Sequence, residues 1–186
     1  MIRLVAALAV TLSMTALADD VHKSATGKWK SEAAEDMGNG SFCTREFKLT
    51  DKTWDLVFTI YADKELKAPL VAMNFSGPWK ATADSKGVAG AHEATFEFAK
   101  KSVTLKNKDA AKGFGMDQCG LEVGKAKDVT KTGCSFVASV EHYGKEFDLL
   151  KRDGDKLFFG ARPADNNMGS EDKRPTSLGA ALVKAK

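Results

Sequence analysis

The sequence predicts an all-β protein, an antiparallel meander that forms a closed or partly open barrel of about eight or more strands. Three observations support this prediction. Apolar and polar residues alternate with period two along most of the chain from Gly27 onward. Turns rich in glycine and aspartate separate the alternating runs at short intervals. No run shows the 3.6-residue period of a long helix. We therefore expect one barrel-like domain over residues 27–184.

The start of the chain has the features of a secretory signal peptide over residues 1–18. Arg3 supplies the positive charge, residues 4–12 form a short apolar run, and Ala16-Leu17-Ala18 is a small-x-small cleavage site. A retained membrane anchor is the alternative, but the apolar run is shorter than a membrane-spanning helix requires. We expect cleavage after Ala18 and a periplasmic or secreted mature protein that does not span a membrane. Residues 19–26 are polar and are expected to be disordered.

The strongest hairpin signal comes from residues 41–49 and 54–61. β-Branched and aromatic residues are frequent in both runs, and the polar residues 50–52 turn the chain between them. Alternation continues after Pro69, and Gly77-Pro78 predicts a break or a bulge in that third run.

The second half of the chain alternates again at 92–98 and 103–105. Residues 108–126 are the least regular part, with a short helix predicted near 109–112. A further strand is predicted at 136–140. Asp153-Gly154 then predicts a type I′ hairpin turn, since glycine accepts the positive φ that this turn requires. Across it we expect Phe147 and Leu149 to pair with Leu157 and Phe159.

Three cysteines, Cys43, Cys119 and Cys134, leave one thiol unpaired if a disulfide forms. Cys119 and Cys134 each lie next to a glycine, and a bridge between them would contribute about 3 kcal/mol in the chain-entropy model. This pairing is favoured over the two that involve Cys43. Cys43 is then expected to be a small buried apolar residue rather than a reactive site.

The composition argues against several function classes. The formal charge of +3 becomes +2 when Arg3 is removed with the signal peptide, and the lysines are dispersed, so nucleic-acid binding is not expected. His22, His92 and His142 lie far apart, and no nucleophile or metal motif surrounds them. We therefore expect no enzyme activity, no cofactor and no metal.

The apolar faces of the strands converge inside a barrel, where they form either a filled core or a pocket for an acyl chain. Arg45 is the exception on this face. A buried arginine needs an anionic partner, which could be the carboxylate of Glu93 or Asp148 or the head group of a lipid. Alternatively, Arg45 lies at the barrel mouth with its charge in water. The candidate ligand-binding residues are Arg45, Phe47, Leu49, Trp54, Leu56, Phe58, Ile60, Val71, Met73, Phe75, Phe96, Phe98, Phe136, Val140, Phe147 and Leu149.

Several segments resemble one family in order and spacing along essentially the whole mature chain. Residues 27–31 resemble its opening G-x-W-x-S, and residues 42–47 resemble its F-L-T-R-x-F strand, with Cys43 in place of leucine. The most specific segment is Arg174-Pro175-Thr176-Ser177. Further similar segments are Tyr61-Ala62-Asp63 with Pro69, Cys119-Gly120, Asp128-Val129-Thr130 with Cys134, Phe147-Asp148-Leu149-Leu150, and Phe159-Gly160.

The family is the adenomatosis polyposis coli down-regulated domain of animal Wnt antagonists, and this chain resembles a single-domain bacterial relative. A further cysteine pair of the family would fall near Ala34 and Leu66, where this chain has no cysteine. The resemblance implies a lipocalin-like cradle for a lipid or other hydrophobic small molecule, without Wnt as the partner. We therefore expect an exported lipid-binding protein. A protein–protein interaction module with a filled core, such as an envelope inhibitor or adaptor, is the alternative.

Overall fold

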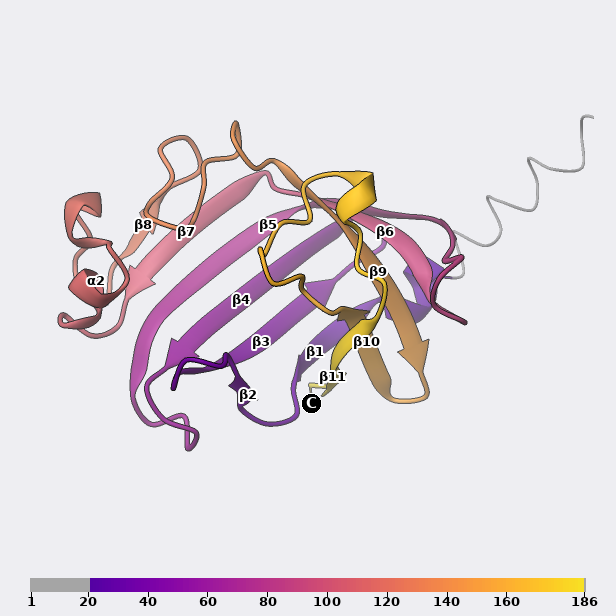
Figure 1. The fold of residues 1–186 in the computed structure, drawn as a ribbon, viewed down its shortest axis with the longest axis horizontal. Helices are drawn as coiled ribbons and strands as arrows, with labels where there is room; N and C mark the ends of the chain where they lie inside the picture. The colour runs from indigo at the N-terminus through magenta and orange to yellow at the C-terminus, as the bar shows by residue number, and fades with distance from the viewer. Residues whose placement is uncertain (1–20, 186) are drawn as a thin grey trace, which may run out of the picture.

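The computed structural model describes residues 21–185 and confirms the all-β barrel. Eight antiparallel strands of the described chain close into a ring, which is seen from one side in Figure 1. The ring closes because β1 pairs with both β3 and β11. In ring order the strands are β1 (Gly27–Ser31), β3 (Phe42–Leu49), β4 (Thr53–Tyr61), β5 (Pro69–Asp84), β6 (His92–Glu97), β9 (Lys145–Asp153), β10 (Lys156–Gly160) and β11 (Leu178–Lys184).

Three further strands within residues 21–185 lie outside the ring. β2 (Glu35–Asp36) pairs with β3, β7 (Lys100–Leu105) pairs with β5, and β8 (Ala126–Asp128) pairs with β7. The sheet formed by β3, β4 and β5 therefore continues past the ring into β7 and β8, and Figure 1 shows this extension on the left.

The extension begins where β5 changes its neighbour at Gly77-Pro78. Residues 79–84 of β5 pair with β6, whereas residues 71–76 pair with β7. A Cβ atom at Gly77 would lie 1.9 Å from the carbonyl oxygen of Glu97, so this crossing point requires glycine. The predicted break is therefore a change of partner within one continuous strand.

Aromatic packing occupies the centre of the ring, and we call this cluster the barrel core. Phe47 stacks on Phe159 with ring centroids 4.2 Å apart, and Phe96 lies parallel to Trp79 at 5.7 Å. Each large apolar side chain buried here contributes about 1.5–3 kcal/mol. The core includes Trp29, Phe47, Leu49, Trp54, Leu56, Trp79, Phe96, Phe98, Leu150, Leu157, Phe159 and Leu182.

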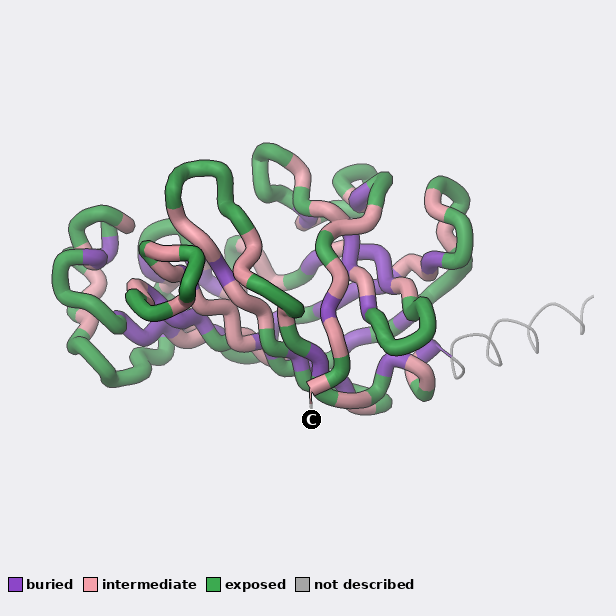
Figure 2. Tube along the Cα trace, turned by 90° about the horizontal axis from the view of Figure 1, so that it is seen from below, coloured by how far each residue is buried: buried purple, intermediate pink, exposed green. Residues whose placement is uncertain are grey.

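A second cluster, the disulfide core, lies under the extension. The disulfide between Cys119 and Cys134 is present, which confirms the predicted pairing. The short helix α2 (Ala110–Gly113) confirms the helix predicted near 109–112, and the turn η1 (Asp117–Cys119) follows it. Figure 2 shows buried segments in the interior and exposed segments mainly in the peripheral loops. The cluster includes Ile60, Val71, Met73, Val103, Leu105, Ala110, Met116, Val129, Cys134 and Val137.

The segment before β1 is ordered in the structure, so the disorder predicted for residues 19–26 is wrong for its described part. Residues 21–25 are helical, and Val21 and Ala25 belong to the barrel core. The His22 ring lies 4.0 Å from that of Trp79, and the indole N–H of Trp29 donates to the Ala25 carbonyl oxygen at 2.8 Å. The predicted signal peptide, residues 1–18, lies outside the described residues. Over residues 21–185, no helix has the length and apolar character to cross a membrane.

The β9–β10 hairpin exists, but its turn and register differ from the prediction. Asp153 pairs with Lys156, so the turn residues are Gly154 and Asp155. Gly154 has a φ of +56°, while Asp155 does not have a positive φ, which excludes type I′ and fits a type II′ turn. Because the turn lies one residue further along, Phe159 pairs with Leu150 and Leu157 pairs with Arg152.

The same shift reverses the predicted faces of β9. Asp148 pairs with Ala94 and Glu146 with Phe96, so Glu146, Asp148 and Leu150 share the inner face. Phe147 and Leu149 therefore lie on the outer face. Residues of the C-terminal part of the chain contact this outer face. The Phe147 N–H donates to the carbonyl oxygen of Met168, and the guanidinium of Arg174 lies 5.5 Å from the centre of the Phe147 ring.

The prediction of a strand at residues 136–140 is also wrong. Cys134 and Val137 form an isolated bridge around a tight turn, and Ser135 adopts a positive φ of 52°. Phe136 at this turn is 53% exposed and lies next to the ring of Phe114 at 6.0 Å. The disulfide constrains this turn, which overrides the alternation of apolar residues in the sequence.

Candidate functional site

An open face lies between the two cores on the inner side of β3, β4 and β5. Phe58 and Phe75 pack against both the barrel core and the disulfide core, yet both remain partly exposed. Arg45 is directly opposite Phe58 on β3 and has the same intermediate burial. We define the open face by Arg45, Phe58 and Phe75. It is a mainly apolar surface that the packing of the protein leaves partly exposed, at a position where the sheet leaves the ring.

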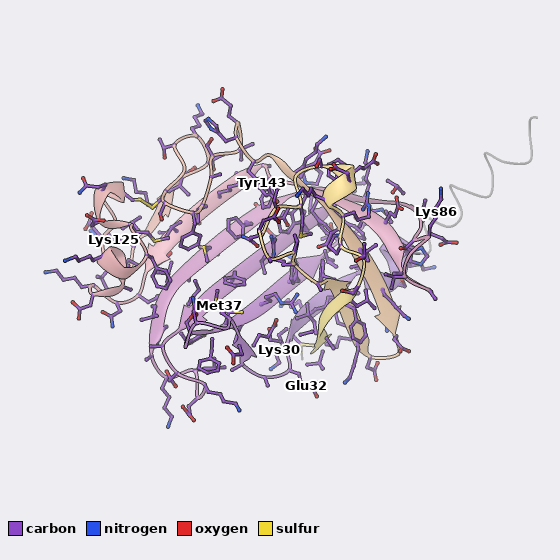
Figure 3. The ribbon with its side chains drawn as sticks, in the orientation of Figure 1. Lys30, Glu32, Met37, Lys86, Lys125 and Tyr143 are labelled. Atoms are coloured by element: carbon purple, nitrogen blue, oxygen red, sulfur yellow. A yellow bond between two sulfur atoms is a disulfide. The ribbon has the colours of Figure 1, made fainter. Side chains whose placement is uncertain are left out.

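The border of the open face toward β9 is formed by the loop between β8 and β9. Phe98 contacts Phe75 edge to face at 5.7 Å, and Tyr143 lies 6.1 Å from Phe98. The Tyr143 hydroxyl accepts a hydrogen bond from the Met168 N–H at 2.8 Å, which fixes the ring in place. Figure 3 draws the side chains on the ribbon and labels Tyr143.

Arg45 is neutralised by a partner that the sequence did not suggest. Its Nε atom lies 2.9 Å from Oε1 of Glu35, and its Nη2 atom donates to the carbonyl oxygen of Ala180 at 3.0 Å. The Ser31 hydroxyl donates to the same carboxylate oxygen of Glu35 at 2.6 Å and accepts the Arg45 N–H at 2.8 Å. Neither predicted partner is used, and Arg45 does not extend into water, since its side chain is only 14% exposed.

Glu93 and Asp148 have other partners. Glu93 lies 3.7 Å from Arg174. Asp148 is buried, and its Oδ1 accepts the N–H groups of Leu149 and Gly160 at 2.7 and 2.8 Å. Burial, and then the charge of Glu146, raise the pKa of the Asp148 carboxyl to about 7, although the two N–H groups act in the opposite direction.

A buried lysine lies between Phe75 and the loop that carries Tyr143. Lys101 is opposite Phe75 on β7, and its Nζ atom donates to the carbonyl oxygens of Ala138 and Tyr143 at 2.9 and 2.7 Å. The same ammonium lies 4.3 Å from the centre of the Phe98 ring. Burial lowers the pKa of Lys101, and the nearby Glu146 partly offsets this effect.

Glu146 forms the second ion pair of this region. Both of its carboxylate oxygens accept hydrogen bonds from Nη2 of Arg162 at 2.7 Å. Burial raises the pKa of the neighbouring Tyr143 hydroxyl, and the charge of Glu146 adds to this effect. The border of the open face is therefore polar, but its charges are already compensated within the protein.

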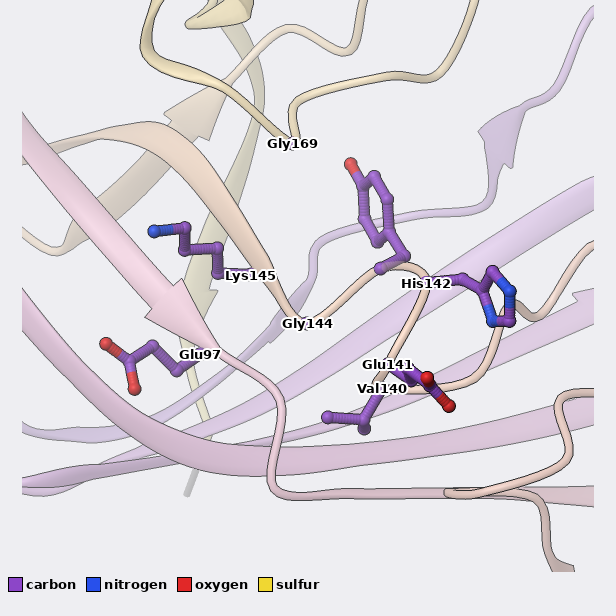
Figure 4. Close-up of a pocket in the computed structure, with 8 residues that line it drawn as sticks. Glu97, Val140, Glu141, His142, Gly144, Lys145 and Gly169 are labelled. Carbon is purple, nitrogen blue, oxygen red and sulfur yellow. The ribbon is translucent and has the colours of Figure 1, made fainter.

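A pocket of about 410 Å³ opens beside the same loop (Figure 4). Val140 and Tyr143 line it and also pack against the barrel core, so it adjoins that core from the outside. Its other walls are largely polar, unlike those of a typical site for an apolar ligand. The complete lining is Glu97, Val140, Glu141, His142, Tyr143, Gly144, Lys145 and Gly169.

The predicted ligand-binding residues lie at six different places in the structure. Arg45, Phe58 and Phe75 form the open face, and Val140 lies at the adjoining pocket. Phe136 is exposed, and Phe147 and Leu149 lie on the outer face of β9. The remaining residues are buried, in the barrel core (Phe47, Leu49, Trp54, Leu56, Phe96, Phe98) or in the disulfide core (Ile60, Val71, Met73).

Two further groups have structural explanations. Oγ of Ser139 lies 2.8 Å from Nδ1 of His142, but it also accepts the His142 N–H at 3.3 Å and is buried, as in a turn capped by serine. Cys43 is outside the disulfide and is buried as predicted, and burial raises the pKa of its thiol to about 11. Throughout residues 21–185, no three His, Cys, Asp or Glu side chains gather in a way that could hold a metal ion.

No protein-family model matches the chain, and no curated protein matches it. The functional argument therefore depends on the geometry of the open face and its surroundings.

Proposed function

We propose that this chain is an exported, periplasmic binding protein for a lipid, an acyl chain or another hydrophobic molecule, which lies on the open face. The observation that carries the proposal is the partial exposure of Phe58 and Phe75 between two packed cores. A disulfide such as Cys119–Cys134 is compatible with an oxidising compartment.

The geometry limits the affinity that this surface can provide. A buried methylene contributes about 0.8 kcal/mol, so a chain of about fourteen carbons that buries half of its surface gains about 5–6 kcal/mol. This corresponds to a dissociation constant on the order of 100 µM, before the cost of ordering the ligand. Tighter binding requires the chain to displace Tyr143 or to enter between the two cores.

The test is a titration with a fluorescent long-chain ester, combined with native mass spectrometry after mild purification. The variant Phe58→Ser removes an inner apolar side chain of β4, and Val57→Ser is the matched control on the opposite face of the same strand. We expect Phe58→Ser to weaken binding about tenfold and Val57→Ser to leave it unchanged. Absence of any bound ligand and of any saturable titration would refute the proposal.

The second candidate is a protein–protein interaction module, an envelope inhibitor or adaptor. It is favoured by the aromatic packing at the centre of the ring and by the exposed Met37, Val123 and Phe136. This candidate predicts that substitution of Phe136 abolishes the interaction, while Phe58→Ser has no effect.

We also propose that the chain is a bacterial relative of the adenomatosis polyposis coli down-regulated domain. The barrel, the Cys119–Cys134 disulfide and the packing of Arg174-Pro175 support this proposal. Arg174 donates to the carbonyl oxygens of Ala94 and Asp148, and Pro175 packs against Gly160, so this segment ties the C-terminal part of the chain to β6, β9 and β10. A solved structure of a bacterial or animal member of the family would test the relationship. The same strand order and the same contacts of the Arg-Pro segment would support it.

A further inference from the structure

The charges that border the open face suggest which head group its ligand carries. Three cations lie here: Arg45, Lys101 and Arg162. Arg45 is paired with Glu35 and with a backbone carbonyl, and Arg162 is held by both oxygens of Glu146. Lys101 donates to two backbone carbonyls and lies over an aromatic ring, with its side chain nearly inaccessible. Each cation of this border therefore has a partner within the protein.

Glu35 pairs with the cation that belongs to the open face itself, Arg45. Glu35 lies on β2 and pairs with Cys43 of β3. Cys43 is two residues before Arg45 on the same strand, and Arg45 is directly opposite Phe58 on β4. The Ser31 hydroxyl holds the carboxylate in position. A ligand carboxylate that approached Arg45 would have to displace Glu35 or remain beside its negative charge, and like charges in a partly buried site repel strongly.

We propose that the open face selects long-chain ligands with an uncharged head group, such as an alcohol or an ester, and that Glu35 excludes the carboxylates of free fatty acids. This inference rests on the proposed function, because it assumes that an apolar chain binds at the open face. A hydroxyl would accept or donate hydrogen bonds at the polar border, and an ester oxygen would accept them, without adding a charge.

The test compares three twelve-carbon ligands, dodecanol, monolauroylglycerol and laurate, each below the concentration at which it aggregates or separates from water. Each competes with a fluorescent long-chain ester for the wild-type chain, for Glu35→Gln and for Glu32→Gln. Glu32 is the matched control: it lies outside the site, is 62% exposed, and is 3.6 Å from Lys156. Circular dichroism and the unfolding midpoint verify that each variant is folded.

We expect wild type to bind both neutral ligands at least tenfold more tightly than laurate. Since a carboxylate is also better hydrated than an alcohol, the decisive result is the variant: Glu35→Gln should bind laurate about tenfold more tightly, while dodecanol binding stays within twofold. The additional substitution Arg45→Gln should abolish this gain, and Glu32→Gln should behave as wild type.

Two results overturn the inference in different ways. Equal laurate binding by wild type and Glu35→Gln, with normal binding of dodecanol, refutes the role of Glu35 and leaves the proposed function intact. Failure of wild type to bind the fluorescent ester and both neutral ligands refutes the proposed function, and the inference with it.

Discussion

Asp148 should make the stability of this protein depend on pH in the direction opposite to that of most carboxylates. Its side chain is buried, and its pKa is raised from 3.8 to about 7, mainly by burial. Because the folded state holds the proton more tightly than the unfolded chain, this group favours folding below about pH 4. The contribution is lost as the pH rises from 4 through 7.

The magnitude follows from the same values. A pKa raised from 3.8 to about 7 corresponds to about 4 kcal/mol in the free energy of unfolding, at about 1.4 kcal/mol per pH unit. The side-chain amide of the variant Asp148→Asn cannot ionise, but its carbonyl can still accept the N–H groups of Leu149 and Gly160. We therefore expect the stability of the variant, relative to wild type, to rise by about 4 kcal/mol between pH 4 and pH 8.

The assay is equilibrium urea unfolding at half-unit pH steps, with Asp155→Asn in the exposed hairpin turn as the control. The slope of the difference between variant and wild type is the readout, because a constant offset reports only the packing of the new amide. A difference that does not change with pH, or that falls as the pH rises, would contradict the assignment of Asp148 as a carboxyl that is protonated in the fold.

The remaining predictions concern the disulfide within the extension and the segment around Arg174, which contacts β6 and β9. Replacement of both Cys119 and Cys134 by serine should lower the free energy of unfolding by about 3 kcal/mol, measured with urea, whereas Cys43→Ala should have a smaller effect. Arg174→Ala should lower the free energy of unfolding by about 2–4 kcal/mol, since two charge-assisted hydrogen bonds to buried carbonyls are lost. The control is Lys173→Ala, a substitution of the exposed neighbour, which should lower the same free energy by less than about 0.5 kcal/mol. Equal unfolding midpoints for Arg174→Ala and Lys173→Ala would contradict the role of Arg174 in holding this segment against β6 and β9.

The sequence was sufficient to predict which side chains point inward where one face of a strand is apolar and the other is polar. β3, β4 and the first half of β5 follow this pattern, so their inner residues were predicted correctly. It was not sufficient for β9, because Leu149 on the outer face and Leu150 on the inner face are both buried. A strand covered on both sides has no alternation that reports its orientation, and a shift of the turn by one residue reverses its faces.

The residues that complete the site were harder to predict for different reasons. Glu35 lies in a two-residue strand that is defined only by its pairing with β3. Lys101 could have been found, because it alternates with Val103 and Leu105 and so belongs to their inner face. Val21 and Ala25 have the i, i+4 spacing of one helix face, which was the available signal that residues 21–25 are not disordered.

Photochemical cross-linking tests the central claim most directly. A long-chain ester with a diazirine on its alkyl chain would be activated in the presence of the folded protein, and the tryptic peptides sequenced by mass spectrometry. We expect labels on peptides 53–64 and 68–80, at or next to Phe58 and Phe75, and competition by unlabelled ester. Labels confined to Phe136 or Val123, or labelling that the unlabelled ester does not reduce, would show that the inner face between the two cores is not a ligand site.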